Sequence, residues 1–402
     1  MVNSPVVSTN PSAAGGERQP AVRRAGGGVR GFWQRVTEGI EISDLWAQFR
    51  AEARSSYGLY SREVDWEEVD KGRRWTRPFR AAWALFLAML MKLSPTRRVL
   101  LLLAIVLMST HVQERPGQTS TIFVELPNLG VVLLFLLLAL ELADRVTMKR
   151  DLEIAREIQR WLVPETPPEI PGYDIAFLSR AANTVAGDYY DTIPRGAARN
   201  AAAKDAKILL VVADVAGKSV PAAILMATFQ ASLRAVEATG TTLGELVQSL
   251  NFYVCENSRS GLRFITAFFA ELETATGGIR YTSAGHHPAL LRRAAGAVQD
   301  LAEGGLPLGI ELDERFPEGQ TSLRPGDILF IYTDGLVEAV NAQGEEFGKS
   351  RLSAVLSPCD GTHTAAEVLA QITRVVDGFV GAARQHDDIT CMVVRRRPAV
   401  SA

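Results

Sequence analysis

The sequence predicts a mixed α/β (α+β) protein in which hydrophobic helices and a linker helix precede a domain of strands and helices. From about residue 171 to 397, short runs rich in apolar and β-branched residues alternate with two helical segments. Residues 79–143 instead hold three apolar runs. Between the two regions lies a segment dense in helix-forming residues, and no internal repeat is visible.

The overall composition places limits on the class of protein. The chain has 402 residues, of which 47% are hydrophobic and 22% charged, and its net charge is -2. This length suits two to three folded units, and the charge balance does not indicate a nucleic-acid partner. The three cysteines, Cys255, Cys359 and Cys391, are far apart. They suggest neither a disulfide framework nor a zinc site, and they favour a reducing compartment.

The N-terminal region is expected to contribute little to a folded core. Residues 1–30 are rich in Gly, Ala, Pro, Ser and Arg, which predicts disorder, and they lack the apolar core of a secretory signal peptide. Residues 31–78 form a short charged segment that we expect to be partly helical and cytoplasmic. No ligand-binding sensor domain is recognisable there.

The apolar runs of residues 79–143 predict a transmembrane hairpin. Basic residues precede the second run and follow the third, whereas only Arg115 lies between them. This asymmetry places both ends of the hairpin in the cytoplasm and residues 111–121 in the outer turn. The run of residues 79–91 fits an interfacial helix better than a third span. Buried core helices are the alternative, because each uncharged stretch is shorter than the roughly 20 residues that a membrane span needs.

Residues 141–164 predict a linker helix. Met148, Leu152, Ala155 and Leu162 follow alternating four- and three-residue steps if Gln159 fills one place. This seam is compatible with a parallel coiled coil, and therefore with a homodimer formed through the linker helix. A single amphipathic helix packed on the next domain explains the pattern equally well, because the seam spans few heptads.

Acidic residues recur where the predicted strands of the C-terminal domain begin or end. "VAGDYYDTI" holds Asp188 and Asp191, "KILLVVADVAGK" ends near Asp214, and "GDILFIYTDG" ends at Asp334. Asp387 and Asp388 open the strand of "HDDITCMVV". Carboxylates gathered at one rim of a sheet would repel each other unless a cation neutralised them. Oxygen ligands without His or Cys at ligand spacing suit Mg²⁺ or Mn²⁺, so the pattern predicts a carboxylate metal centre for one or two ions.

Seven sequence blocks carry a resemblance to a known family. They are "DLEIAREIQRWLVPETPP", "AGDYYD", "VVADVAGKSVPAAILMA", "YTSAGHHPALL", "LPLGI", "LRPGDILFIYTDGLVEAVNAQGEEFG" and "HDDITCMVVR". In order and spacing they resemble the bacterial SpoIIE-like branch of the PPM-type (type 2C) metal-dependent protein serine/threonine phosphatases. The resemblance covers residues 151–395. It implies two antiparallel β-sheets packed as a sandwich and flanked by helices, with the metal ions held at one end of the sandwich.

The resemblance also implies a role for individual residues. Asp214 matches the carboxylate that bridges two metal ions, and Asp188 matches the first acid that faces them. The backbone carbonyl of Val215, together with Asp334 and Asp387, matches the remaining ligands, and Asp388 is the less favoured member of its pair. Asp191, Gly335 and Asp388 are expected around the metal centre as residues that support the ligands.

The sequence departs from the family pattern at a few positions. Ala186 and Ser219 stand where the family usually has glycine. Ala216 occupies the place of a histidine proposed as a general acid in eukaryotic relatives, so the proton for the leaving group must come from elsewhere. His286 and His287 match a turn of the family and are expected to be structural. His386 is only adjacent to a predicted ligand.

The resemblance implies hydrolysis of a phosphoserine or phosphothreonine protein substrate by metal-activated water, with two Mn²⁺ or Mg²⁺ ions as cofactors. An anti-sigma-factor antagonist in partner-switching signalling is the expected substrate. The bacterial inner membrane is the expected location, with the catalytic domain in the cytoplasm. A catalytically weak, membrane-tethered binding module is one alternative. A metal-dependent phosphodiesterase or nuclease is another, although the sequence shows no basic groove for nucleic acid.

Overall fold

The computed structural model describes residues 80, 83, 84, 87, 90–109, 126–195, 206–217, 220–257, 263–359 and 362–398. The chain divides into two compact units, residues 1–140 and 141–402. The predictions for residues 1–30 and 31–78 and for the outer turn at residues 111–121 lie outside the described residues. The boundary between the units falls within helix α6 (Leu126–Leu162), so each unit is treated separately below.

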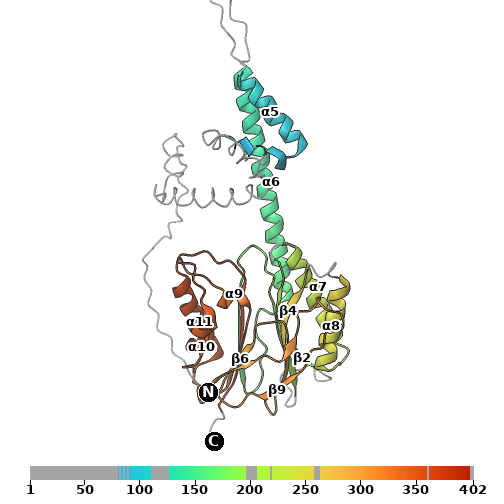
Figure 1. Cartoon of the computed structure of the whole chain (residues 1–402), viewed down its shortest axis with the longest axis vertical. Coiled ribbons are helices and arrows are strands. Elements are labelled where there is room, and N and C mark those ends of the chain that lie inside the picture. The colour runs from blue at the N-terminus through green and yellow to red at the C-terminus, as the bar shows by residue number, and fades with distance from the viewer. Residues whose placement is uncertain are drawn as a thin grey trace, which may run out of the picture. The chain divides into compact units, whose positions relative to one another are not determined.

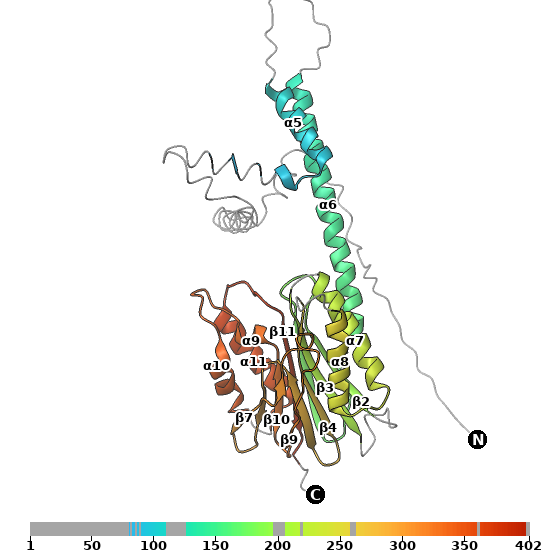
Figure 2. The ribbon, with the colours of Figure 1, turned by 45° about the vertical axis from the view of Figure 1, so that its right-hand side comes forward.

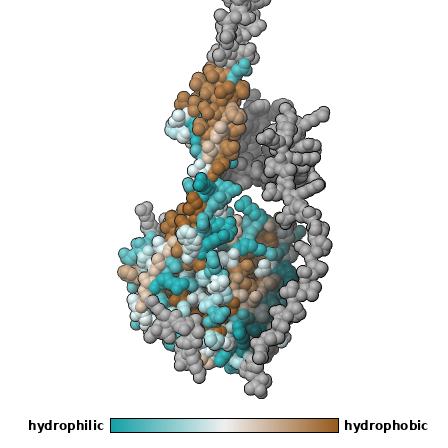
Figure 3. All heavy atoms as spheres, turned by 180° about the vertical axis from the view of Figure 1, so that it is seen from behind, coloured by the Kyte–Doolittle hydropathy of each residue, from teal (hydrophilic) through white to brown (hydrophobic). Residues whose placement is uncertain are grey.

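The first unit holds helix α5 (Pro95–Ser109) and the start of α6. The two helices contact each other at small residues, because a Cβ atom added to Gly130 would lie 2.8 Å from the carbonyl oxygen of Ala104. Ala104 is completely buried. The outward sides of both helices carry exposed apolar residues, which Figure 3 shows as a hydrophobic surface.

The predicted transmembrane hairpin of residues 79–143 is not supported. In the described part of the chain, no helix combines the length and the apolar character that a membrane crossing requires. Helix α5 has 15 residues, fewer than the roughly 20 that a span needs. The apolar start of α6 continues without a break into charged sequence from Glu141 onward. The location of the protein in the cell stays a prediction.

Two β-sheets form the centre of the second unit. The first has the strand order β1 (Tyr173–Arg180), β11 (Ile389–Arg396), β10 (Ile328–Tyr332), β6 (Ala289–Arg292) and β7 (Val298–Leu301). The second has the order β2 (Tyr189–Arg195), β3 (Lys207–Val215), β4 (Ile265–Glu273), β5 (Gly278–Ala284) and β8 (Gly304–Gly305), and β9 (Gly319–Ser322) also pairs with β5. The short β5–β8 pair is parallel, and the other pairs between these strands are antiparallel.

Helices cover the outer face of each sheet. Figures 1 and 2 show α7 (Val220–Glu237) and α8 (Leu243–Asn257) on one side of the sandwich. The other side holds α9 (Asp334–Val337), α10 (Gly348–Leu356) and α11 (Ala365–Val380). The N-terminus of α11 is closed by a capping box between Thr364 and Glu367. The predicted architecture of two sheets with flanking helices is therefore confirmed.

Strand β3 is apolar at almost every position because both of its faces are covered. Ile208, Leu210 and Val212 belong to the core between the two sheets. Leu209 and Val211 belong to the core beneath α7 and α8. Successive side chains of a strand point to opposite faces, so a strand that is covered on both faces needs apolar residues throughout. The third core lies between the first sheet and α10 and α11.

The second half of α6 packs on its own domain through part of the predicted seam. The apolar run from Leu126 and the predicted linker helix of residues 141–164 form one continuous helix instead of two. Gln159 is buried against the domain, and Leu152, Ala155 and Leu162 are half-buried. The side chain of Gln159 donates to the carbonyl oxygen of Ala186 at 2.6 Å and accepts from the Ala186 N–H at 3.0 Å. The side-chain amide of Gln159 is therefore hydrogen-bonded within its own chain. Pairing of α6 with a second copy stays a prediction.

Replacing Gln159 with leucine should loosen the chain around Ala186. The substitution keeps a similar volume but removes both hydrogen bonds, each of which contributes about 0.5–1.5 kcal/mol. We expect the peptide around Ala186 to exchange its amide hydrogens roughly tenfold faster, as measured by hydrogen-exchange mass spectrometry. Gln248→Leu is the matched control, because the Gln248 side chain is exposed and makes only a 3.5 Å contact with the Leu312 carbonyl. Unchanged exchange in Gln159→Leu would contradict this prediction.

Candidate metal centre

Four of the predicted acids lie at one end of the sandwich. Asp188 directly precedes β2 and Asp214 lies near the end of β3, and the pairing of Tyr189 with Ala213 sets these two acids opposite each other. In the other sheet, Asp334 follows β10 and Asp387 precedes β11, and these two strands are paired. The two sheets thus bring acids that are distant in sequence to the same edge of the domain.

Asp188 is held by a buried hydroxyl. Its Oδ2 atom accepts a hydrogen bond from Thr333 Oγ1 at 2.9 Å, and the same Thr333 oxygen accepts from the Thr390 N–H at 2.9 Å. Asp188 is 4% exposed. Burial, followed by the neighbouring charge of Asp214, raises the pKa of Asp188 well above its usual range.

Asp214 also lies among neighbouring carboxylates. Burial and then the charge of Asp334 raise its pKa to about 7, and the charges of Asp387 and Asp388 act in the same direction. A hydrogen bond with Asp188 partly offsets this effect. Carboxylates that raise each other's pKa are stabilised by a cation among them. The residues present therefore fit a divalent ion that prefers oxygen ligands, such as Mg²⁺ or Mn²⁺.

The two neighbouring acids of "HDDIT" have different surroundings. Both oxygens of Asp388 accept backbone hydrogen bonds, from the Ala182 N–H at 2.7 Å and from the Gly187 N–H at 2.6 Å. Asp387 accepts a hydrogen bond from the Asp388 N–H, which lies 3.0 Å from its Oδ1 atom. Asp388 thus fixes the loop before Asp188, and this use favours Asp387 as the metal ligand.

Two glycines allow the loops of the site to approach one another. A Cβ atom added to Gly335 would lie 2.0 Å from the Asp388 carbonyl oxygen, so a larger residue would push the "TDG" and "HDD" loops apart. A Cβ atom added to Gly187 would lie 3.1 Å from the Val215 carbonyl oxygen and 3.6 Å from Asp214 Oδ1. The Val215 carbonyl, which is a predicted ligand, is therefore next to the loop that carries Asp188. Ser219 lies outside the described residues.

The carboxylate of Asp191 makes its contacts away from this group of acids. It is completely buried, and its carboxylate accepts hydrogen bonds from the Tyr189 hydroxyl and from the Thr192 N–H. It also forms an ion pair with Arg234 of α7. These contacts tie β2 to the helix above it, so Asp191 acts as a structural acceptor and not among the residues that support the predicted metal ligands.

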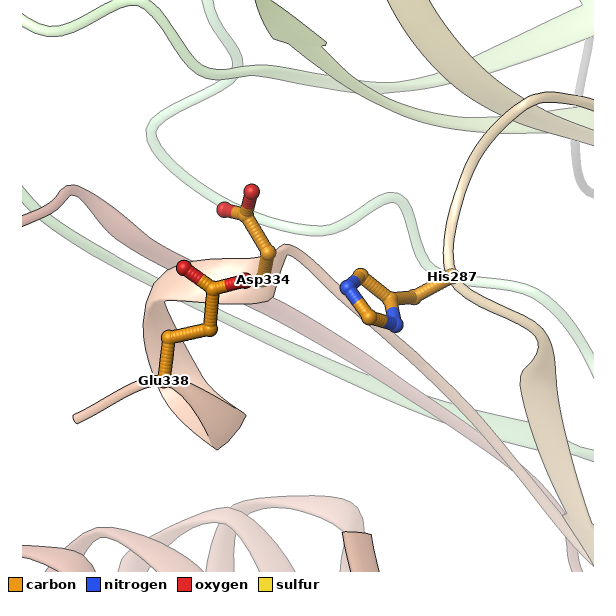
Figure 4. Close-up of side chains that lie close together, drawn as sticks. All are labelled: His287, Asp334 and Glu338. Atoms are coloured by element: carbon orange, nitrogen blue, oxygen red, sulfur yellow. The ribbon is translucent and has the colours of Figure 1, made fainter. Parts of the chain in front are cut away.

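The two adjacent histidines differ in their surroundings. His286 is buried, its ring contacts Thr266 Oγ1 and the Tyr332 carbonyl at 3.0 Å each, and burial lowers its pKa to about 3. It is a neutral structural residue, as expected. His287 instead faces Asp334 and Glu338, and the potential ligand atoms of the three residues all lie within 4.8 Å of one another (Figure 4).

Sequence reasoning missed both His287 and Glu338. The four-residue spacing of Asp334 and Glu338 was the available signal for the acid, because residues four apart share one face of a helix. Nothing in the sequence distinguished His287 from His286. Burial and the charge of Asp334 raise the pKa of Glu338, which extends the crowding of negative charge beyond the predicted ligands.

A pocket of about 200 Å³ adjoins the predicted ligands. Gly335, Glu338 and Asp387 line one part of it, and the basic residues Arg180 and Arg384 line another, together with His386. Arg180 also forms an ion pair with Asp377 at 2.7 Å, which fixes its position. The site thus combines carboxylates suited to metal ions with nearby cationic groups suited to an anionic substrate.

The raised pKa of Asp214 predicts how stability depends on pH when the metal is removed. The fold favours the protonated carboxyl, so this contribution is fully present below about pH 3.8 and is lost as the pH rises through about 7. In excess chelator, we expect the free energy of unfolding to fall between pH 5 and pH 8. We also expect Asp214→Asn to reduce that fall by about 1 kcal/mol or more, after allowance for solvent screening.

Urea unfolding at both pH values would measure this difference. Asp313→Asn serves as the control because Asp313 is exposed. An equal fall in the free energy of unfolding of wild type and of Asp214→Asn would show that the Asp214 carboxylate does not cause the loss of stability.

Comparison with known proteins agrees with this geometry. Residues 204–397 match the family model described as stage II sporulation protein E (SpoIIE). The chain is 27% identical over 286 residues to protein IcfG of Synechocystis sp., a match that covers 65% of this chain and 43% of IcfG. It is also 27% identical over 254 residues to the phosphoserine phosphatase RsbU of Bacillus subtilis, covering 62% of this chain and 71% of RsbU.

A solved structure supports the fold. The SiaA-PP2C domain of Pseudomonas aeruginosa superimposes with a TM-score of 0.52 at 21% identity, and the match covers 63% of this chain and 98% of that domain. The chain spans less than half of the length of IcfG, so the likeness concerns the sandwich domain. The order of the motifs, the two-sheet fold and the family match agree. Residues 204–397 therefore carry a match to the SpoIIE family, and the domain is similar to the PP2C-type protein serine/threonine phosphatases, among them the phosphoserine phosphatase RsbU.

Proposed function

We propose that this protein is a metal-dependent protein serine/threonine phosphatase whose metal ligands are Asp188, Asp214, Asp334, Asp387 and the Val215 carbonyl. The observation that carries the proposal is the convergence of these acids from both sheets. Burial and neighbouring carboxylates raise the pKa values of Asp188 and Asp214. Two Mn²⁺ or Mg²⁺ ions, when bound, would supply an activated water and polarise the phosphoryl oxygens.

The residues of the chain have distinct tasks in this proposal. Asp214 lies between the other acids and would hold both ions. Thr333 fixes the orientation of Asp188 through its hydroxyl, and Asp388 fixes the loop that carries Asp188 through two backbone N–H groups. Arg384 and Arg180 line the adjoining pocket, where their charges would attract the phosphorylated segment of a substrate.

The cysteines do not favour a covalent mechanism. Cys359 and Cys391 are buried, and burial raises the pKa of the Cys391 thiol. Burial also raises the pKa of Cys255. A nucleophilic cysteine needs the opposite shift, because the thiolate is the reactive form.

A phosphoserine protein is the substrate that the comparisons favour, since RsbU is named a phosphoserine phosphatase. We propose a regulator of the anti-sigma-factor antagonist type, which partner-switching signalling would control by phosphorylation. The resemblance to the SpoIIE-like branch supports this substrate class.

Asp214→Asn should abolish Mn²⁺-dependent dephosphorylation of a phosphoserine protein while the domain stays folded. The substitution removes the carboxylate that is expected to hold both ions, and it also relieves repulsion, so stability without metal should not fall. Phosphate release measures activity, and circular dichroism checks the fold. Asp313→Asn should behave as wild type because Asp313 is exposed. Retention of most activity by Asp214→Asn would contradict the assignment of Asp214 as a metal ligand. An inactive wild type under the same conditions would favour a binding module.

Deleting residues 1–140 should yield a soluble and still metal-dependent enzyme. All the predicted ligands lie in the unit of residues 141–402, which begins where the deletion ends. We expect catalytic efficiency on a small phosphoester with Mn²⁺ to stay within about threefold of the full chain, because no ligand is lost. An insoluble product would instead show that the apolar helices α5 and α6 are part of the core that this domain needs.

A further inference from the structure

We propose that His287, Asp334 and Glu338 form an additional site for a transition-metal ion such as Zn²⁺, beside the carboxylate centre and sharing Asp334 with it. This inference goes beyond the proposed function, because the five ligands assigned above do not include His287 or Glu338. It also does not depend on phosphatase activity, because the arrangement of the three side chains carries it.

The three side chains converge from two parts of the fold. Asp334 begins α9 and Glu338 is the C-cap residue that follows it, so one helical turn presents both carboxylates on the same side. His287 comes from the loop between β5 and β6 and directs its ring towards them (Figure 4). One nitrogen or oxygen atom from each residue lies within 4.8 Å of the others.

His287 is positioned before any ion binds. Its ring stacks on Tyr332, with the ring centroids 5.9 Å apart and the planes inclined by 27°. The preceding residue, His286, contacts the Tyr332 carbonyl, and its backbone is tied to the Ser283 hydroxyl. Within the described part of the chain, neither ring nitrogen of His287 takes part in a hydrogen bond. The imidazole is therefore held in place with its ligand atoms available.

The chemistry of the donors selects the class of ion. Imidazole nitrogen suits Zn²⁺ and other first-row transition ions, whereas Mg²⁺ prefers an all-oxygen shell. Bonds of about 2.0–2.2 Å keep any two ligand atoms within about 4.4 Å of each other, and the three atoms here all lie within 4.8 Å of one another. Glu338 is exposed, so its side chain has room to adjust to an ion. Three protein ligands leave a further position open for water or substrate.

The surroundings supply both a route and an electrostatic reason for binding. Glu338 also lines the pocket next to Asp387, so an ion can reach the site through that opening. Glu346 and Asp387 add negative charge around Glu338, beyond the charge of Asp334. A further cation at this point would neutralise Glu338, which is not among the ligands of the first centre.

Zinc stoichiometry tests the proposal. The full chain, stripped of metal and then held in excess Mg²⁺, is dialysed against increasing Zn²⁺, and the bound zinc per chain is measured by atomic absorption. We expect wild type to bind one more Zn²⁺ than His287→Ala. Glu338→Gln should weaken that step at least about tenfold, because an amide oxygen is a poorer ligand than a carboxylate. His363→Ala controls for loss of a histidine away from the site.

Cobalt gives an independent measurement of nitrogen ligation. In the Co²⁺-loaded full chain, proton NMR should show a strongly shifted imidazole N–H signal that is lost in His287→Ala and kept in His363→Ala. Equal zinc binding by wild type and His287→Ala, or a cobalt spectrum that the substitution leaves unchanged, would overturn the proposal. So would a matching loss of Mg²⁺ affinity in His287→Ala, since His287 would then act only by shaping the first centre. These readouts are separate from turnover, so the failure of this site and the failure of the proposed phosphatase activity are distinguishable.

Discussion

The hydroxyl of Thr333 is the contact on which the arrangement of the metal centre depends. It donates to Asp188 and accepts from the Thr390 N–H, so one buried side chain joins the "GDYYD", "YTDG" and "DDIT" segments. Thr333 and Thr390 are completely buried. Leaving a buried donor or acceptor without a partner costs about 1–3 kcal/mol, so this hydroxyl holds acids from both sheets in one register.

The Thr333 contact is needed because the sandwich brings together carboxylates that repel each other. Backbone contacts hold the loops in place against this repulsion. Asp388 accepts two N–H groups from the loop before Asp188, and Gly335 lets the neighbouring turn approach the Asp388 carbonyl. Asp191 adds an ion pair with Arg234 that joins β2 to α7. The protein thus maintains a group of carboxylates whose mutual repulsion a bound cation would relieve.

The sequence indicated the parts of the site that depend on local pattern. The apolar run that leads to Asp214 lies in β3, and the runs around Asp334 and Asp387 correspond to β10 and β11, because strands covered on both faces need continuous apolar residues. The two-sheet architecture came from family resemblance, since period and propensity do not encode which strands pair. The roles of His287 and of Asp388 depend on contacts between distant segments, which a single sequence does not show. The predicted hairpin is not supported, because within the described residues no helix is long and apolar enough to cross a membrane.

The contact between α6 and the loop of Asp188 limits what the linker helix can transmit. Gln159 holds both the N–H and the carbonyl of Ala186, which lies two residues before Asp188 and one before Gly187. Gly187 in turn donates to Asp388, so three consecutive steps lead from the helix to the acids. Two hydrogen bonds of ordinary strength contribute about 1–3 kcal/mol together. A state of α6 that breaks them can therefore shift the loop equilibrium by about tenfold to a hundredfold, because a signal acts only through the difference in free energy between the two states.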